Sequence, residues 1–267
     1  MTIRLLVSDV DGTLVDKHKQ LTPATIAAVA RLRSAGIGFT IISARPRSGM
    51  MPIADALGID GPMAAFNGGI VFQHNGQIAS HVTIDAQVAQ GMLDLVGAAP
   101  VDCWVFSEDR WYASSDQGVH VAHECISSDQ RPIITTDFTA LLGNADKITL
   151  VSDDAALLGG LADRAKAMFG GRATIAQSQT YYLDVTALVA NKGNGVAALA
   201  AAYGVPLDQV AAIGDQANDL PMLARVGLSV AMGNGPEAVR RAAQHITLGN
   251  DQDGVAHAID TLIAPRF

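Results

Sequence analysis

The sequence predicts an α/β protein whose core is a Rossmann-like, doubly wound parallel sheet, with an inserted α+β cap domain. Apolar, strand-like runs alternate with helical patterns at both ends of the chain, whereas hairpins and further strands are expected in the middle. Of the 267 residues, 49% are hydrophobic and 16% are charged, which is typical of a globular protein. A chain of this length is expected to form one large domain or two closely joined ones.

The N-terminal part of the chain alternates strand and helix. Residues 3–8 form a short apolar run that ends in Asp-Val-Asp-Gly, which is typical of a buried strand leading into a turn. Thr22 and Pro23 then predict the N-cap and first turn of a helix, which Gly36 closes. The same alternation predicts a strand and a helix at residues 38–42 and 47–57.

The C-terminal part repeats this alternation. Helices are expected at residues 194–203, 218–223 and 236–243, with strands at residues 210–213 and 228–231 between them. Because alternating strands and helices produce a parallel sheet covered by helices, we expect ligands to bind at the carboxyl ends of these strands.

The middle of the chain has the pattern of a separate α+β domain. A hairpin is predicted at residues 102–113. Further strands are expected at residues 147–151 and 181–185, and helices at residues 86–96 and 155–169. The predicted domains are therefore a core of residues 1–81 and 187–267 and a cap of residues 82–186, which folds over the strand ends of the core.

Net charge and cysteine content restrict the partners and the compartment. The 26 Asp and Glu exceed the 18 Lys and Arg, and the net charge of −8 would repel both a phosphodiester backbone and an anionic bilayer. Cys103 and Cys125 are too few for a disulfide framework, and the apolar run near the N-terminus is too short for a signal peptide. We expect a cytoplasmic protein that binds neither nucleic acid nor a membrane, with no evident protein partner.

Two carboxylates follow the first predicted strand. Asp9 and Asp11 stand two residues apart in Asp9-Val10-Asp11-Gly12-Thr13, where Gly12 lets the backbone turn sharply. In such a pair, one acid can stay ionised as a nucleophile while the other holds a proton for the leaving group. An acidic turn or a fragment of a Ca²⁺-type loop also explains this segment when it is taken alone.

A second acidic segment follows the strand predicted at residues 210–213. It reads Gly214-Asp215-Gln216-Ala217-Asn218-Asp219, and in a parallel sheet it would share one edge with the first. Asp9 and Asp215 could then hold Mg²⁺, because this ion takes oxygen ligands and usually combines one or two carboxylates with substrate phosphate. Helix capping by Asp215 or Asn218 is the alternative for this segment alone.

Lys192 and Ser43 offer groups that could bind phosphate. A carboxylate that approaches a phosphate anion to about 4 Å meets a repulsion of ~4 kcal/mol per charge pair at an effective dielectric constant of ~20, and Lys192 with Mg²⁺ would offset it. Ser43-Ala44-Arg45 follows the second predicted strand, and its hydroxyl and backbone amides could bind a phosphate oxygen. The alternatives are a solvated Lys192 and a helix N-cap at Ser43.

Two other patterns suggest different ligands. Gly193-Asn194-Gly195-Val196-Ala197-Ala198 fits the Gly-x-Gly-x-x-Ala pattern of NAD-binding folds, but Asn191-Lys192 interrupts the strand that should run directly into the first glycine. A zinc site could be drawn from His120, His123 and Cys125, but a fourth ligand at a recognisable spacing is missing. We expect these three residues to form a cluster on the cap surface.

Taken together, the acidic segments, the serine motif and Lys192 resemble the four ordered motifs of the haloacid dehalogenase (HAD) superfamily. The large insert between the second and third motifs resembles that of the Cof-type subgroup with a type IIB cap. Three flanking segments carry this second resemblance: Asn67-Gly68-Gly69, Val230-Ala231-Met232-Gly233-Asn234 and Asp253-Gly254-Val255. The resemblance covers essentially the whole chain and implies a HAD-like core.

The resemblance also implies a chemistry for the two acidic segments. Asp9 would attack phosphorus to form an aspartyl-phosphate, while Asp11 would protonate the leaving oxygen and then activate the hydrolytic water. Mg²⁺ would be held by Asp9, the main-chain carbonyl of Asp11, and Asp215. The substrate implied is a small phosphorylated metabolite, such as a sugar phosphate.

The remaining motif residues are expected to bind phosphate or to support the metal site. The resemblance implies that Ser43, Lys192 and Asn218 bind the phosphoryl group and that Asp219 supports the metal or Lys192 from behind. Arg45 is a further candidate for binding phosphate or substrate.

Ala44 departs from the family pattern, which usually has glycine at this position. If the backbone there needs a positive φ, alanine would be strained and the geometry around Ser43 would change. The predicted function is a Mg²⁺-dependent phosphatase. The alternatives are a phosphotransferase (mutase), a phospho-acceptor signalling module and a non-catalytic protein that binds phosphorylated ligands.

Overall fold

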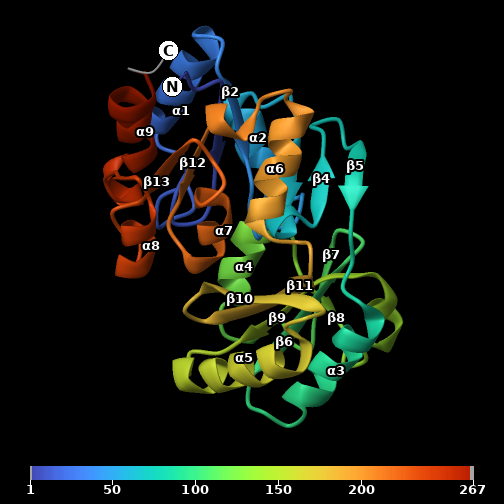
Figure 1. Ribbon diagram of the computed structural model, residues 1–267. Helices are drawn as coiled ribbons and strands as arrows, with labels where there is room; N and C mark the ends of the chain where they lie inside the picture. The colour runs from blue at the N-terminus through green and yellow to red at the C-terminus, as the bar shows by residue number, and fades with distance from the viewer. Residues whose placement is uncertain (1, 265–267) are drawn as a thin grey trace.

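The core sheet is parallel and combines strands from both ends of the chain (Figure 1). A computed structural model describes residues 2–264. The core strands are β1 (Leu5–Ser8), β2 (Gly38–Ile41), β12 (Val210–Gly214), β13 (Leu228–Ala231) and β14 (His245–Ile246). They pair in the order β14-β13-β12-β1-β2, and every pairing is parallel. The predicted α/β core is therefore confirmed, with β1 beside β12.

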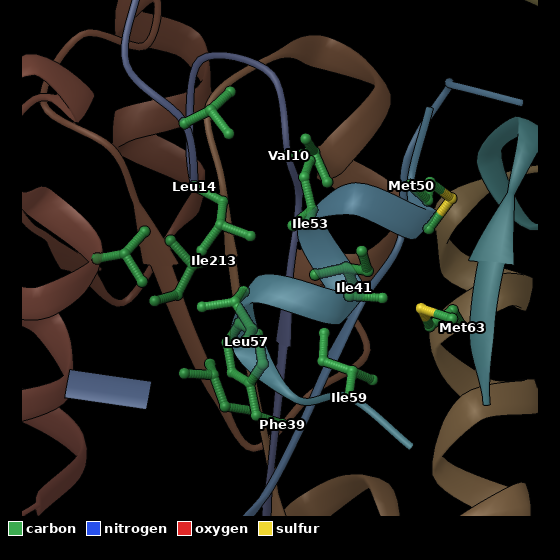
Figure 2. Close-up of a cluster of buried hydrophobic side chains, with 14 of the residues drawn as sticks. Val10, Leu14, Phe39, Ile41, Met50, Ile53, Leu57, Ile59, Met63 and Ile213 are labelled. Carbon is green, nitrogen blue, oxygen red and sulfur yellow. The ribbon is translucent and has the colours of Figure 1, made fainter. Parts of the chain in front are cut away.

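Helices cover both faces of this sheet. They are α1 (Pro23–Ser34), α2 (Met51–Leu57), α6 (Lys192–Ala202), α7 (Leu220–Leu223), α8 (Glu237–Ala242) and α9 (Gly254–Ala258). Successive residues of β1 face opposite sides, since Leu6 packs with α1, α2 and α9, whereas Leu5 and Val7 pack with α6, α7 and α8. Figure 2 shows the first cluster, in which Phe39 of β2 and Leu57 of α2 lie together.

A small antiparallel sheet leads from the core to the cap. It consists of β3 (Met63–Ala65), β4 (Ile70–Phe72) and β5 (Ile78–His81), paired in that order. The chain then passes into the second large sheet, which lies below the core in Figure 1.

The second large sheet has six strands in the order β10-β11-β9-β6-β7-β8. They are β6 (Asp102–Ser107), β7 (Arg110–Ala113), β8 (Ile133–Ile134), β9 (Ala145–Val151), β10 (Ala173–Gln179) and β11 (Tyr182–Ala187). Helices α3 (Ala86–Val96) and α5 (Ala155–Phe169) pack on one face, whereas α4 (Val121–Ser128) lies between this sheet and the core (Figure 1). We call residues 82–186 the cap; the division of the chain at residues 81 and 187 stays a prediction.

Two predicted helices differ clearly in extent, and α4 and β10 are among the elements that were not predicted. The helix expected at residues 47–57 begins only at Met51, because residues 48–50 form a turn, and the helix expected at 218–223 is a 3₁₀ turn followed by α7. Helix α4 lacks a side-chain N-cap, and β10 is an edge strand with several polar residues, so neither has a clear sequence signal. Across residues 2–264, no helix has the length and apolar character needed to span a membrane.

Candidate active site

The two acidic segments meet at the carboxyl ends of β1 and β12. Asp9 directly follows β1, and its backbone N–H donates to the carbonyl of Ile213 on β12 at 2.9 Å. One carboxylate oxygen from each of Asp9, Asp215 and Asp219 lies within 4.8 Å of the others, and all three residues are buried. The convergence expected from parallel strands is therefore present in the structure.

Lys192 lies among these carboxylates. It is the first residue of α6, whose N-cap Asn191 accepts the backbone N–H of Asn194. The Lys192 Nζ donates to Asp9 Oδ1 at 2.5 Å and to Asp219 Oδ1 at 2.6 Å, and the residue is only 1% exposed. Burial alone would lower the pKa of Lys192, but Asp219 and Asp9 raise it above its usual value, so the ammonium group stays charged.

Asp219 supports both Lys192 and the segment that carries Asp215. Its Oδ2 accepts the backbone N–H groups of Asp215 at 2.8 Å and Gln216 at 2.9 Å, while its Oδ1 accepts from Lys192. Through these contacts Asp219 fixes the position of Lys192 and of the backbone that carries Asp215.

Asp9 and Asp215 have the electrostatic character of cation ligands. Burial, opposed by Lys192 and reinforced by Asp219, raises the pKa of Asp9 to about 6. Burial and the neighbouring Asp9 and Asp219 raise the pKa of Asp215 to about 8. Buried carboxylates that repel one another bind a divalent cation well, because its charge removes the repulsion. The donor set therefore fits Mg²⁺, which takes oxygen ligands.

Gly12 and Thr13 allow the first acidic segment to fold around Asp215. Gly12 has a φ of 81°, and a Cβ there would overlap the carboxylate of Asp215. Thr13 Oγ1 donates to Asp215 Oδ1 at 3.1 Å, and Asn234 Nδ2 donates to the Gly12 carbonyl at 2.9 Å. A glycine is thus required both by the turn and by the close approach of the two acidic segments.

Asp11, two residues after Asp9, is held by two cations. Arg45 donates through Nε to Asp11 Oδ2 at 2.7 Å and through Nη2 to Oδ1 at 2.8 Å, and Lys19 Nζ donates to Oδ1 at 2.6 Å. Burial would raise the pKa of Asp11, but Arg45 and Lys19 hold it well below its usual range. Lys19 was not predicted, because nothing distinguishes it locally from a solvated lysine.

Ser43 and Asn218 both line the same cavity as Asp9. The Ser43 Oγ accepts the backbone N–H of Arg45 at 3.1 Å, and the residue is buried. Asn218 Nδ2 donates to Asn67 Oδ1 at 3.2 Å, and the buried Asn218 Oδ1 has no hydrogen-bond partner within residues 2–264. Ala44 does not have a positive φ, so the backbone strain considered for this position does not arise.

The cap forms the opposite wall of this cavity. Glu124 and His123 of α4, Lys147 of β9 and Gln179 of β10 line it, and sequence reasoning identified none of them as site residues. Lys147 Nζ donates to the Ala44 carbonyl at 3.1 Å. His123 was expected on the cap surface, and it is a half-buried residue on the face of the cap that is directed toward the core. Its ring borders the cavity, and its buried Nδ1 has no hydrogen-bond partner in the described part of the chain.

The two alternative ligand patterns do not form sites. Residues 193–198 lie inside α6 instead of in a strand-to-helix turn, and Gly195 packs closely on Gly68, since a Cβ there would be 3.1 Å from the Gly68 Cα. His120 bonds to Asp153 at 2.6 Å and stacks on Tyr181 with 3.9 Å between ring centroids. Within residues 2–264, the aspartate triad is the one group of three or more potential metal ligands.

Because Glu124 is buried, we expect its carboxyl group to make the stability of the folded protein depend on pH. Burial raises the pKa of Glu124 from 4.5 to about 7, although Lys147 opposes this. Between these two pH values the folded protein binds a proton that the unfolded chain has released, so its stability falls as the pH rises through this window. The other charged or titratable groups near the carboxyl are Asp11, Arg45, Tyr182 and Asp184.

Glu124→Gln removes this titration. We expect its free energy of unfolding, relative to the unmodified protein, to increase between pH 5 and pH 8 by up to about 3 kcal/mol, as the pKa difference implies. Urea unfolding at several pH values measures this difference. A constant difference across the range would show that Glu124 titrates normally.

The chain is similar over nearly its whole length to known hydrolases. The model of the haloacid dehalogenase-like hydrolase family matches residues 6–259. Pyridoxal phosphate phosphatase YbhA of Escherichia coli is 27% identical over 270 residues, which cover 97% of this chain and 98% of that protein.

Solved structures show the same similarity. A haloacid dehalogenase-like hydrolase from Bacteroides thetaiotaomicron superposes with a TM-score of 0.84 at 27% identity, over 97% of this chain and 98% of its own. A sugar phosphatase of HAD subclass IIB shares the fold, with a TM-score of 0.84 at 22% identity over 96% of this chain and 98% of its own.

Proposed function

This chain belongs to the family of haloacid dehalogenase-like hydrolases and is a phosphatase of its Cof-type subgroup, and from that premise we propose that it hydrolyses a small phosphorylated metabolite through a phosphorylated Asp9. The observation that carries the proposal is the buried cluster in which Asp9 and Asp215 lie together with Lys192 and line one cavity. A nucleophile, a cation site and a phosphate-binding ammonium group are thereby within reach of one phosphoryl group.

Asp9 performs the first step in this proposal. Its carboxylate attacks phosphorus, and the bond between phosphorus and the leaving oxygen breaks. Asp11 gives its proton to that oxygen. A water then attacks the phosphorylated Asp9 and passes a proton to Asp11, which restores both carboxyl groups and releases inorganic phosphate.

Asp11 must exchange its ion-pair partners to take part in both steps. Its contacts with Arg45 and Lys19 favour the ionised form, which suits the proton acceptor of the second step. To donate a proton in the first step, Asp11 must first be protonated, which requires that its contacts with Arg45 and Lys19 weaken and that its pKa rises. The phosphate of a substrate offers Arg45 and Lys19 an alternative anion, so substrate binding would loosen that hold.

Asp9, the main-chain carbonyl of Asp11, and Asp215 would hold Mg²⁺. When bound, this ion supplies positive charge that lowers the repulsion between the Asp9 carboxylate and an incoming phosphate. Lys192, Ser43 and Asn218 bind the phosphoryl oxygens. The raised pKa values of Asp9 and Asp215 support a cation in this position, and the buried Asn218 Oδ1, which has no hydrogen-bond partner within residues 2–264, can accept from a donor group of a ligand.

The cap wall favours a polar leaving group. Glu124, Lys147, His123 and Gln179 present both donors and acceptors, and few apolar side chains line the cavity. Hydroxyl groups, as in a sugar phosphate, can satisfy such a wall, whereas a large aromatic leaving group would leave buried polar atoms without partners.

The test is phosphate release from a panel of sugar phosphates, pyridoxal phosphate and p-nitrophenyl phosphate. We expect turnover with Mg²⁺ and a fall of at least about 100-fold after the metal is removed by a chelator, since a metal ion supplies several kcal/mol of charge stabilisation. Restored turnover on addition of Mg²⁺ is the control for damage by the chelator. Undiminished activity in the chelator would contradict the metal-dependent mechanism.

A further inference from the structure

Several cap segments that lie far apart in the sequence contact one short loop of the core. This docking loop, residues 44–49, follows β2 and contains Arg45 at one end and Gly49 at the other. Three of its residues contact the cap through polar groups. The Ala44 carbonyl accepts from Lys147 at 3.1 Å, Arg47 pairs with Asp109 at 3.2 Å, and Ser48 donates to the end of α4. The loop is therefore held from the cap side along its whole length.

Ser48 lies at the centre of a hydrogen-bond network with the end of α4. Its Oγ donates to the Ser128 carbonyl at 2.6 Å and accepts from Gln130 Nε2 at 2.8 Å. Gln130 also donates to the Asp109 carbonyl at 2.8 Å and accepts the Trp111 N–H at 3.0 Å. Gln130 thus ties the docking loop, the β6–β7 turn and the end of α4 together.

Gly49 joins this interface to Arg45. Its carbonyl accepts from Arg45 Nη1 at 3.0 Å, while on its other side a Cβ would overlap the backbone oxygen of Ser127. The same guanidinium uses Nε and Nη2 to hold Asp11. A continuous chain of contacts therefore links the cap to the carboxylate of Asp11. It runs from Ser127 through Gly49 to Arg45 and then to Asp11.

We propose that cap residues 127–130 position Arg45 through the docking loop, so that the guanidinium is aligned with Asp11 and the substrate phosphate only when the cap is docked. Ser48, Gly49 and Gln130 are positioning residues in this scheme, because none of them holds Asp9 or the proposed metal. The consequence for the phosphatase reaction rests on the function proposed above, whereas the hold on Arg45 does not.

The first test measures the hold on Arg45 directly. Arg45 is only 6% exposed, so we expect phenylglyoxal to modify it slowly in the unmodified protein, as mapped by mass spectrometry with the exposed Arg31 as internal reference. Gly49→Ala prevents close docking and should speed the modification of Arg45. Gly143→Ala is the matched control, because a Cβ at Gly143 meets no atom within 4 Å.

The second test measures the reaction with the same variants. A displacement of catalytic groups by about 1 Å can lower turnover on the order of 100-fold. We expect a fall in kcat of this size for Gly49→Ala, because the variant displaces Arg45. Ser48→Ala loses interface hydrogen bonds and should lower kcat by about 5-fold, whereas Ser48→Thr keeps the hydroxyl and should restore it. KM should change less than kcat in each case, since Lys192, Ser43 and Asn218, which bind the phosphoryl group in the proposed reaction, stay in place.

Two outcomes would overturn the proposal. One is an unchanged rate of Arg45 modification in both Gly49→Ala and Ser48→Ala. The other is faster modification of Arg45 with kcat at the level of Gly143→Ala. If no substrate is turned over even by the unmodified protein, the proposed function fails, but the modification rates still decide whether the cap holds Arg45.

Discussion

Replacing Asp9 by asparagine is expected to abolish phosphate release, with a fall in kcat on the order of 10⁴-fold or more. Asparagine keeps the shape of the side chain but is a far weaker nucleophile than a carboxylate. The fold should survive, because Lys192 keeps its 2.6 Å contact with Asp219 and one of three crowded carboxylates is removed. Steady-state turnover and thermal unfolding of Asp9→Asn measure the two effects.

Asp102→Asn is a suitable control, because Asp102 lies on β6 and does not line the cavity. It should keep the turnover of the unmodified protein. Residual turnover of Asp9→Asn above about 1% would mean that another group attacks phosphorus, provided that deamidation of the new asparagine is excluded by mass spectrometry.

Replacing Lys192 by methionine is expected to cause the largest loss of stability. The substitution leaves Asp9 and Asp219 buried without the ammonium group that lies 2.5 Å and 2.6 Å from them. Breaking a buried ion pair by removing one partner destabilises proteins by roughly 3–5 kcal/mol. Urea unfolding without metal measures this loss, and phosphate release should fall as well, because a cation that binds the phosphoryl group in the proposed reaction is removed.

Two further variants separate charge from packing at this position. Lys166→Met changes an exposed lysine of α5 and should alter stability by less than about 0.5 kcal/mol. Lys192→Met combined with Asp219→Asn removes a cation and an anion together and should recover part of the loss. A Lys192→Met protein as stable as the unmodified one would show that the buried carboxylates do not need this cation.

The catalytic core of the site was predictable because it depends on local patterns and one topological rule. Apolar runs that end in Asp9 and Asp215 predict two strands, and the parallel arrangement of neighbouring strands brings their ends to one edge. Lys192 could be predicted to face this edge because it lies just before the helix expected at residues 194–203, where the chain returns from the cap. The left-handed turn at Gly12 is likewise indicated by the sequence, because a glycine directly follows Asp11 in the first acidic segment.

The cap side of the site was not predictable, because its residues reach the cavity only through the way in which two sheets dock. Glu124 and His123 belong to a helix without a capping signal, and Lys147 lies in the middle of a buried strand. Lys19 reaches Asp11 from a turn in which it has a φ of 61°, a conformation that sequence does not predict for lysine. Such positions follow from tertiary packing instead of local spacing.

A covalent phosphoryl group on Asp9 is the most direct sign that the buried carboxylates act as proposed. The protein can be mixed with a turned-over substrate and Mg²⁺, quenched in acid within milliseconds, and digested for mass spectrometry. We predict one added phosphoryl group on the peptide that contains Asp9, present in the unmodified protein and absent from Asp9→Asn. Release of phosphate with no such adduct at any quench time, or an adduct on a different residue, would contradict the proposed mechanism.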